Sequence, residues 1–273
     1  MSDYKKLAVI KYGGNAMIND EITTALLENM AELSKKGYKI VIVHGGGPFI
    51  KNTLKMAGIE SEFVGGHRKT DSKSIKYIEM ALKGEVNGKL VRKINNLGLK
   101  AVGLSGKDGK LATAVKRYHK NEKQEEIDLG QVGDVEIISP GIINLLLDND
   151  FIPVVTSVAT GKDGKDYNIN ADMFAGHLAG ALNADKFIML TDVDGLMEDP
   201  SRPETIINEI KINDINELVN RIIKGGMIPK TEACKIALEN GAGSAMILNG
   251  TKPEQLMKVF KNADGKQGTK FLK

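Results

Sequence analysis

Two short apolar runs near the start of the chain end in glycine-rich turns. The run at 7–10 leads into 11–14 (KYGG), and the run at 39–43 leads into 44–47 (HGGG). A β-branched run that stops at glycines is typical of a buried strand, and bare glycine backbone lets an anion approach closely. Two such turns at two strand ends, one of them beginning with Lys11, predict one phosphate or carboxylate site between them.

Strand and helix patterns alternate along the rest of the chain. Strands are predicted at 7–10, 39–43, 100–104, 151–155, 186–190 and 244–248, and helices at 20–36, 48–57, 72–96, 142–147, 173–182, 213–223, 230–239 and 253–260. The segment 111–133 is polar and reads as a hairpin with the charged run 120–128 at its tip. Alternation of this kind predicts an α/β fold, a three-layer αβα sandwich around a mainly parallel sheet, with ligands beyond the carboxyl ends of the strands.

Composition sets limits on the class of protein. The 273 residues carry 38 Lys and Arg and 35 Asp and Glu, a net charge of +3 spread along the chain. Such a surface is solvated and lacks the basic footprint of a nucleic-acid binder. The lone Cys234 makes no internal disulfide and is expected to be a small buried helix residue. Without a signal peptide or a run of about 20 apolar residues, we expect a cytoplasmic protein with no membrane contact.

Three segments downstream carry polar residues where a ligand is expected. Arg68 follows paired glycines and precedes a helix, so it is either a solvated loop residue or a carboxylate clamp. Asn168 and Asn170 lie two apart in extended chain and therefore point the same way. Asp172 stands beside them at a helix start, where it is either a helix cap or part of a functional cluster. Lys230, predicted to begin a helix, opposes the helix dipole unless an anion is bound there.

The common nucleotide and hydrolase signatures are absent. No Gly-Lys pair is followed by Ser or Thr, and neither Gly45-x-Gly47 nor Gly241-x-Gly243 is completed by a third glycine. The four histidines lack metal-ligand spacing and no nucleophile elbow accompanies them. Asp192 and Asp194 are spaced loosely enough to be either metal ligands or an ordinary turn. From the residues alone we therefore predict only an anion site served by lysines from both ends of the chain.

Six motifs, taken together, resemble those of the amino acid kinase family over essentially the whole chain. In order they are 11–17 (KYGGNAM), 44–48 (HGGGP), 66–71 (GHRKTD), 167–172 (YNINAD), 191–193 (TDV) and 225–230 (GGMIPK). Each motif alone is weak, but six in the family's order and spacing are specific. Among family members the motifs are most similar to those that phosphorylate N-acetyl-L-glutamate.

The resemblance implies a reaction and a set of residues. The γ-phosphoryl of MgATP would be transferred to the side-chain carboxylate of N-acetyl-L-glutamate, giving an acyl phosphate for arginine biosynthesis, with ATP holding most of the Mg²⁺. The residues it carries over are Lys11, Lys230 and Asp172 for catalysis, Gly46, Gly47, Arg68, Asn168 and Asn170 for the acyl amino acid, and Gly13, Gly14, Thr191, Asp192, Val193, Gly195, Met197, Lys224, Gly226 and Met227 for ATP. The two lysines would stabilise the transferring phosphoryl, and Asp172 would hold them in place.

The resemblance also implies an organisation. Residues 1–183 would form a lobe for the acyl amino acid and the dimer interface, and residues 184–273 a lobe for ATP. The chain begins close to its first strand, without the additional N-terminal helix of arginine-inhibited hexameric members, so we expect a homodimer that arginine does not inhibit. A hexamer in light scattering, or loss of activity in millimolar arginine, would contradict this expectation.

Two features depart from the family pattern, and other functions stay open. Lys69 stands where an apolar residue is expected, and 249–251 (NGT) replaces the more usual Asp-Gly-Arg. One rival is a kinase for N-protected 2-aminoadipate in lysine biosynthesis, since one methylene provides only about 1–3 kcal/mol of discrimination. Carbamate, uridylate, aspartate and glutamate 5-kinases share the fold but fit 66–71 and 167–172 less well. A non-catalytic amino-acid or ATP sensor on the same fold is the alternative from another class.

Overall fold

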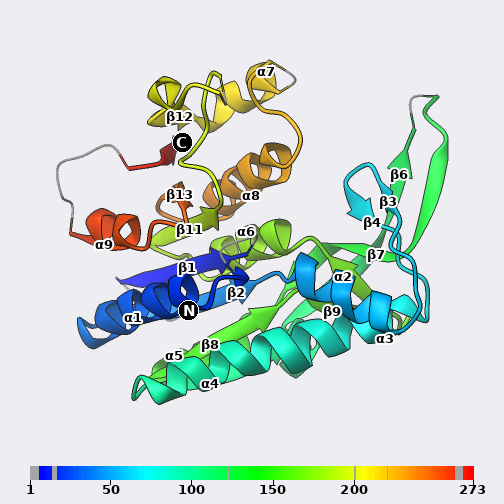
Figure 1. The fold of residues 1–273 in the computed structure, drawn as a ribbon, viewed down its shortest axis with the longest axis horizontal. Helices are drawn as coiled ribbons and strands as arrows, with labels where there is room; N and C mark the ends of the chain where they lie inside the picture. Colours follow the sequence, from blue (N-terminus) through cyan, green and yellow to red (C-terminus); the bar gives the residue numbers. More distant parts are fainter. Residues whose placement is uncertain (1–5, 14–16, 122, 200, 220, 262–266) are drawn as a thin grey trace.

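A parallel sheet forms the centre of the computed structural model (Figure 1), which describes residues 6–13, 17–121, 123–199, 201–219, 221–261 and 267–273. Eight strands of this described part of the chain form the sheet, in the order β12, β14, β13, β11, β1, β2, β8 and β5. Their bounds are Glu209–Lys211, Thr269–Leu272, Ala245–Asn249, Lys186–Thr191, Leu7–Tyr12, Lys39–His44, Phe151–Thr156 and Lys100–Ser105. All neighbours from β13 to β5 pair in parallel, and β13 and β14 pair antiparallel.

Side-chain alternation along β1 assigns the helices to the two faces of the sheet. Ala8 and Ile10 belong to one buried cluster, with residues of α1 (Asp20–Lys35), α4 (Gly88–Asn96) and α9 (Glu254–Phe260). Leu7 and Val9 belong to the other, with residues of α5 (Gly141–Asp148), α6 (Ala171–Ala181) and α8 (Met227–Glu239). Since successive strand residues face opposite sides, Lys11 continues the second set and points toward α6. The three-layer sandwich expected from the sequence is confirmed.

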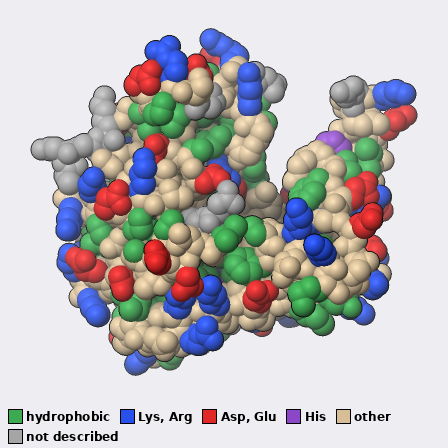
Figure 2. All heavy atoms as spheres, viewed as in Figure 1, with side chains coloured by type: hydrophobic (Ala, Val, Ile, Leu, Met, Phe, Trp, Pro, Cys, Tyr) green, Lys and Arg blue, Asp and Glu red, His purple; other side chains and the backbone are tan. Residues whose placement is uncertain are grey.

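A smaller set of strands projects from this body. β6 (Ala112–Lys120) and β7 (Glu126–Ile138) form a long hairpin, which closes into a small barrel with β9 (Val158–Gly161) and β10 (Asp166–Ile169). The short pair β3 (Phe63–Val64) and β4 (His67–Arg68) lies beside this hairpin. We call β3, β4, β6 and β7 the arm. Figure 2 shows the surface hollowed between the arm and the part of the molecule that contains the C-terminal segment.

Most predicted elements are present, with a few corrections. The predicted helix 213–223 is wrong over most of its length, because only Ile215–Leu218 form the α-helix α7. The predicted helix 230–239 is extended at its start, since α8 begins at Met227 and Lys230 lies in its first turn. The long helix 72–96 exists as α3 (Ser74–Glu79), a π-helical segment Met80–Asn87 (η2) and α4. Helix α2 covers Gly47–Met56.

Two compositional expectations can also be compared with the structure. Cys234 is fully buried on α8 and unpaired, as expected of a small apolar helix residue. No helix of the described residues is both long enough and apolar enough to cross a membrane.

Helices α6 and α8 approach each other closely at one glycine. A Cβ on Gly176 of α6 would lie 2.5 Å from the carbonyl oxygen of Ala233 on α8. Because the obstacle is backbone, it can yield only if one helix moves. Gly176 therefore sets the spacing of the two helices whose first turns carry Asp172 and Lys230.

Replacing Gly176 tests this contact. Gly176→Ala is expected to lower the free energy of unfolding by about 1–3 kcal/mol, because the added methyl overpacks the helix pair. Gly88→Ala is the matched control, since nothing lies within 4 Å of the position that its Cβ would take. That variant should gain up to about 1 kcal/mol from helix propensity. Urea unfolding measures both, and equal effects of the two substitutions would contradict the close approach.

Candidate active site

The site is built around one carboxylate shared by two ammonium groups. Asp172, the second residue of α6, lies with Oδ1 2.6 Å from Lys11 Nζ and with Oδ2 3.0 Å from Lys230 Nζ. The side chain of Asp172 is 6% exposed, that of Lys11 8% and that of Lys230 18%. The three predicted catalytic residues are therefore brought together at the carboxyl end of β1, from helices and a strand far apart in sequence.

Electrostatics keep this cluster charged. Burial acts to raise the pKa of Asp172, but the ammonium groups of Lys11 and Lys230 outweigh burial and hold the pKa below the usual value. The cluster carries a net charge of +1, which favours an additional anion. Gly13 makes room for the Lys11 ammonium group, because a Cβ there would lie 2.6 Å from Lys11 Nζ and displace it. Gly14, its predicted neighbour in the site, lies outside the described residues.

A cavity of about 300 Å³ opens above the cluster. Its lining includes both Lys11 and Asp172, the glycine loop 45–47, and the predicted residues Arg68, Asn168 and Asn170. The loop leads into α2, so free backbone amides and the positive end of the helix dipole border the cavity. Its volume is at the small end of the range for ligand sites, as expected for a small metabolite.

Arg68 provides an unused donor at this cavity. It is 9% exposed, and its Nη1 is buried without a hydrogen-bond partner among the described residues. Its Nη2 lies 3.5 Å from the Gly47 carbonyl oxygen, and the Phe63 ring centroid lies 4.5 Å from Cζ. A buried guanidinium with a free donor fits a carboxylate ligand, so the clamp interpretation is favoured over a solvated loop.

The two asparagines have different roles. Asn170 caps α6, because its Oδ1 accepts hydrogen bonds from the backbone N–H groups of Asp172 at 2.8 Å and Met173 at 3.3 Å. The cap interpretation of Asp172 is therefore wrong, and its carboxylate is free for the lysines. Asn168 lies on the short strand β10, within the segment expected to be extended chain, and it lines the cavity.

Ser157 is a cavity residue that the sequence analysis did not single out. It follows the buried strand β8, and its hydroxyl donates to the Ile169 carbonyl oxygen at 2.8 Å, which ties β10 to the sheet edge. The signal was present, because a polar pair, Thr156 and Ser157, stands at the same edge as the glycine turns.

Apart from Gly13 and Gly14, the residues expected to bind ATP lie in two segments, 191–197 and 224–227. Thr191 is the last residue of β11 and the first residue of the segment 191–197. Within this segment the backbone of Gly195 has a φ of 148°, a value that favours glycine. Lys224, Gly226 and Met227 precede or begin α8, and Gly226 lines a second cavity of about 400 Å³ between α8 and the arm. The cavity above Asp172 includes none of the residues 191–197. Their contact with ATP stays a prediction.

Both departures from the family pattern have local partners. Lys69 Nζ lies 3.2 Å from Glu62 Oε2 across the β3–β4 hairpin, and Lys69 is not part of the cavity lining. Asn249 Nδ2 donates to Asp194 Oδ1 at 2.8 Å, and Lys252 Nζ lies 2.7 Å from the same oxygen. An aspartate at position 249 would have no side-chain N–H group to donate to Asp194. The pKa of Asp194 is lowered by these partners, Lys252 first.

Within the described ranges, no group of three or more His, Cys, Asp or Glu side chains is arranged to hold a metal ion. Asp194 is already engaged by Asn249 and Lys252, which supports the turn interpretation of the 192–194 segment.

Comparison with known proteins agrees with this architecture. Residues 6–249 match the model of the amino acid kinase family, and the chain belongs to that family. It is 44% identical over 263 residues to the acetylglutamate kinase of Pelotomaculum thermopropionicum, covering 94% of this chain and 89% of the relative. The acetylglutamate kinase of Archaeoglobus fulgidus is 46% identical over 253 residues, with 91% and 87% covered. A crystal structure of a Streptococcus mutans protein superposes with a TM-score of 0.77 at 27% identity, covering 97% and 98%.

The shared carboxylate generates a stability prediction. Asp172→Asn removes the charge that compensates two buried ammonium groups, so we expect the free energy of unfolding at pH 7 to fall by about 3–5 kcal/mol. The pKa of Asp172 is lower in the folded protein than in the unfolded chain, where it is near 4. The stabilisation that the ionised carboxylate provides is therefore fully present above the unfolded pKa, and it is lost as the pH falls through the pKa of the folded protein. The difference between wild type and variant should therefore narrow in acid.

Urea unfolding between pH 7 and pH 3 measures this difference. Asp150→Asn is the control, because Asp150 pairs with Lys39 on the surface with its side chain 82% exposed, and its urea midpoint should hardly change. A difference between wild type and Asp172→Asn that stays constant into acid would contradict the assignment.

Proposed function

We propose that this chain is an acetylglutamate kinase, an ATP-dependent phosphotransferase acting on the side-chain carboxylate of N-acetyl-L-glutamate in arginine biosynthesis. The observation that carries the proposal is the Lys11–Asp172–Lys230 cluster, because its Lys11 and Asp172 line a cavity that is also lined by Arg68, whose Nη1 has no partner among the described residues. The acetylglutamate kinases at 44% and 46% identity, covered over most of their length, support the choice of substrate.

The acyl amino acid would occupy the cavity. Arg68 would bind its α-carboxylate through the free Nη1, and Asn168 would bind the acetamido end. The apolar side chains of Ile50, Leu82 and Val132 line the same cavity and suit the acetyl methyl and the methylenes. The side-chain carboxylate would then lie toward the glycine loop 45–47 and Lys11, where the phosphoryl group arrives.

The chemistry requires cations and no general base. A glutamate-like carboxylate, with a pKa of about 4.3, is ionised at neutral pH. One carboxylate oxygen attacks the γ-phosphorus, an O–P bond forms, and the bond from the γ-phosphorus to the bridging oxygen breaks as ADP leaves with the electron pair. A single like-charge pair at about 4 Å costs about 4 kcal/mol at an effective dielectric near 20. Lys11, Lys230 and the amides at the start of α2 would offset that repulsion and stabilise charge in the transition state.

ATP would lie at the carboxyl end of β11, along the segments 191–197 and 224–227, with Gly13 and Gly14 near its phosphates. Mg²⁺ would be coordinated chiefly by phosphate oxygens and would neutralise charge on them. The net positive cluster and the lack of a three-ligand acidic group among the described residues fit an ion that arrives with the nucleotide. The residues 1–183 would thus hold the acyl amino acid and the residues 184–273 the nucleotide. The cytoplasmic location and the homodimer stay predictions.

Acyl-hydroxamate formation tests the function directly. Purified protein with MgATP and hydroxylamine is compared on N-acetyl-L-glutamate, N-acetyl-L-2-aminoadipate, L-glutamate and L-aspartate. We expect turnover that favours N-acetyl-L-glutamate. A preference for the longer acid would move the protein to lysine biosynthesis with the same mechanism, and ATP binding without turnover on any acid would indicate a sensor.

Neighbouring residues on the arm provide a matched test of substrate binding. Arg68→Gln removes a charge-assisted contact, so KM for N-acetyl-L-glutamate should rise at least about tenfold while KM for ATP stays within twofold. Lys69→Gln removes the adjacent charge, which pairs with Glu62 away from the cavity, and should change neither constant more than twofold. Steady-state kinetics with both substrates measure these constants. Equal effects of the two substitutions would remove Arg68 from the substrate site.

A further inference from the structure

A chain of hydrogen bonds runs through the core beneath the glycine loop. His44, the last residue of β2, is fully buried, and its Nε2 lies 2.9 Å from Asn87 Nδ2. Its Nδ1 lies 2.9 Å from the Gly45 carbonyl oxygen. Asn87, 2% exposed, ends the π-helical segment Met80–Asn87, and its Nδ2 also lies 2.8 Å from the Val154 carbonyl oxygen on β8. Four polar groups are thus connected inside an otherwise apolar layer.

The chemistry of these partners fixes the positions of the protons. The Val154 carbonyl only accepts, so the amide nitrogen of Asn87 must face it. The same nitrogen donates its second hydrogen to His44 Nε2, which must therefore be unprotonated. The proton of the neutral imidazole is on Nδ1, from which it is donated to the Gly45 carbonyl oxygen. Burial lowers the pKa of His44 to about 4, so the ring is neutral at physiological pH.

The hydrogen bond to Gly45 orients the next peptide group. In a trans peptide the N–H points opposite to the C=O. Since the Gly45 carbonyl is directed at the His44 ring, the Gly46 N–H is directed away from that ring. Gly46 is also confined from below, because a Cβ there would lie 2.7 Å from Leu82 Cδ2 and 3.3 Å from Val86 Cγ2 on the π-helical segment.

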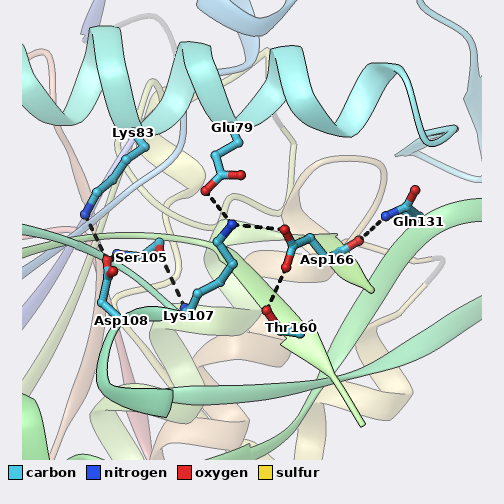
Figure 3. A network of polar contacts seen from close by, with 8 residues as sticks. All are labelled: Glu79, Lys83, Ser105, Lys107, Asp108, Gln131, Thr160 and Asp166. Atoms are coloured by element: carbon cyan, nitrogen blue, oxygen red, sulfur yellow. Dashed lines mark hydrogen bonds and ion pairs between the residues drawn. The ribbon is translucent and has the colours of Figure 1, made fainter. Parts of the chain in front are cut away.

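The π-helical segment is itself fixed on the neighbouring strands. Lys83 Nζ donates to the Gly103 carbonyl oxygen at 2.7 Å and to Asp108 Oδ2 at 2.9 Å. Figure 3 shows Lys83 on this segment reaching Asp108, and Glu79, one residue before the segment, reaching Lys107. On β5, a Cβ at Gly103 would lie 1.9 Å from Asn87 Oδ1. Glycine at position 103 therefore leaves the space that the side-chain amide of Asn87 occupies.

Lys107 extends the same network to the strand that carries Asn168. Its Nζ lies 2.7 Å from Glu79 Oε1 and 2.9 Å from Asp166 Oδ2 on β10 (Figure 3). Helix α3, which continues into the π-helical segment, and strand β10, which carries the cavity residue Asn168, are therefore connected through one ammonium group. π-helical turns are rare in proteins as a whole, but those that occur are often at functional sites. Here the segment places Asn87 against His44.

We propose that His44 and Asn87 are positioning residues of the phosphotransfer site. Asn87 selects the Nδ1–H tautomer of His44, and that tautomer holds the Gly45–Gly46 peptide with the Gly46 N–H toward the reacting groups. The inference rests on the proposed function, because it assigns the Gly46 amide to the transition state of that reaction. Neither side chain borders the cavity, so both act through the backbone between them and the substrates.

Two substitutions at His44 separate its two nitrogens. The amide nitrogen of Asn takes the place of Nδ1, so His44→Asn retains the donor to the Gly45 oxygen and loses the acceptor for Asn87. The amide of Gln reaches the place of Nε2, so His44→Gln retains the acceptor and loses the donor. We expect kcat to fall 10- to 100-fold in His44→Gln and at most a few-fold in His44→Asn, with KM for ATP within twofold in both.

Hydroxamate kinetics on both variants, with urea unfolding to confirm folding, provide the comparison. Equal losses in the two variants, no loss in either, or a larger loss in His44→Asn would overturn the proposal, since a purely structural role predicts no such order.

The tautomer itself is measured without turnover. The chain has four histidines, so ¹⁵N-histidine labelling gives a spectrum in which His44 is assigned as the signal that persists when His67, His119 and His177 are each replaced by Gln. We expect the Nδ1–H form in the wild type, and an Nε2–H form would overturn the proposal even if neither variant folds. If the wild type forms no hydroxamate, the proposed function fails while the tautomer result still stands on its own.

Discussion

The shared ionic contact of Asp172 is the constraint on which the site depends. Lys11 comes from the first strand, Asp172 from the start of α6 and Lys230 from the first turn of α8. Each of these positions is fixed by something else: Lys11 by side-chain alternation along β1, Asp172 by the Asn170 cap, and Lys230 by the close approach of α8 to Gly176. Removing Asp172 from the three would leave two ammonium groups close together without a compensating charge, which is costly. The position of an anion site between the glycine turns follows from that arrangement.

The central strands and most helices could be predicted from the sequence, because hydrophobic periodicity and glycine punctuation are local signals. The runs at 7–10 and 39–43 became β1 and β2, and the hairpin within 111–133 became β6 and β7, although β7 continues to Ile138. Features that depend on contacts between distant parts of the sequence were not predicted. β9 and β10 pair with β6 and β7 across long sequence separations, and nothing in 166–169 marks a strand. The π-helical turn at 80–87 has the same apolar spacing as an ordinary helix at this length.

Within the site, residue types were predicted better than their partners. The sequence pointed to the lysines and Asp172 together, but it left open whether Asp172 caps the helix, whereas Asn170 makes that cap. Both residue types cap helices, and only the pull of two ammonium groups decides which side chain turns away. The partner of Lys69, the residue that departs from the family pattern, could not be predicted from the sequence, because Glu62 comes close to it only when the β3–β4 hairpin forms. The family resemblance located the segments, and the three-dimensional structure assigned individual atoms within them.

The continuity of the sheet has a mechanical consequence. β1 pairs with β2 on one side and with β11 on the other, so the strands before and after residue 183 share one hydrogen-bonded ladder. Two bodies joined this way cannot swing on a free linker. Any opening between the glycine loop and α8 must be absorbed as a change of twist along the β1–β11 pair, while the ladder stays intact. Lys11 stands at the end of that pair, so a change of twist there would move its ammonium group relative to Asp172.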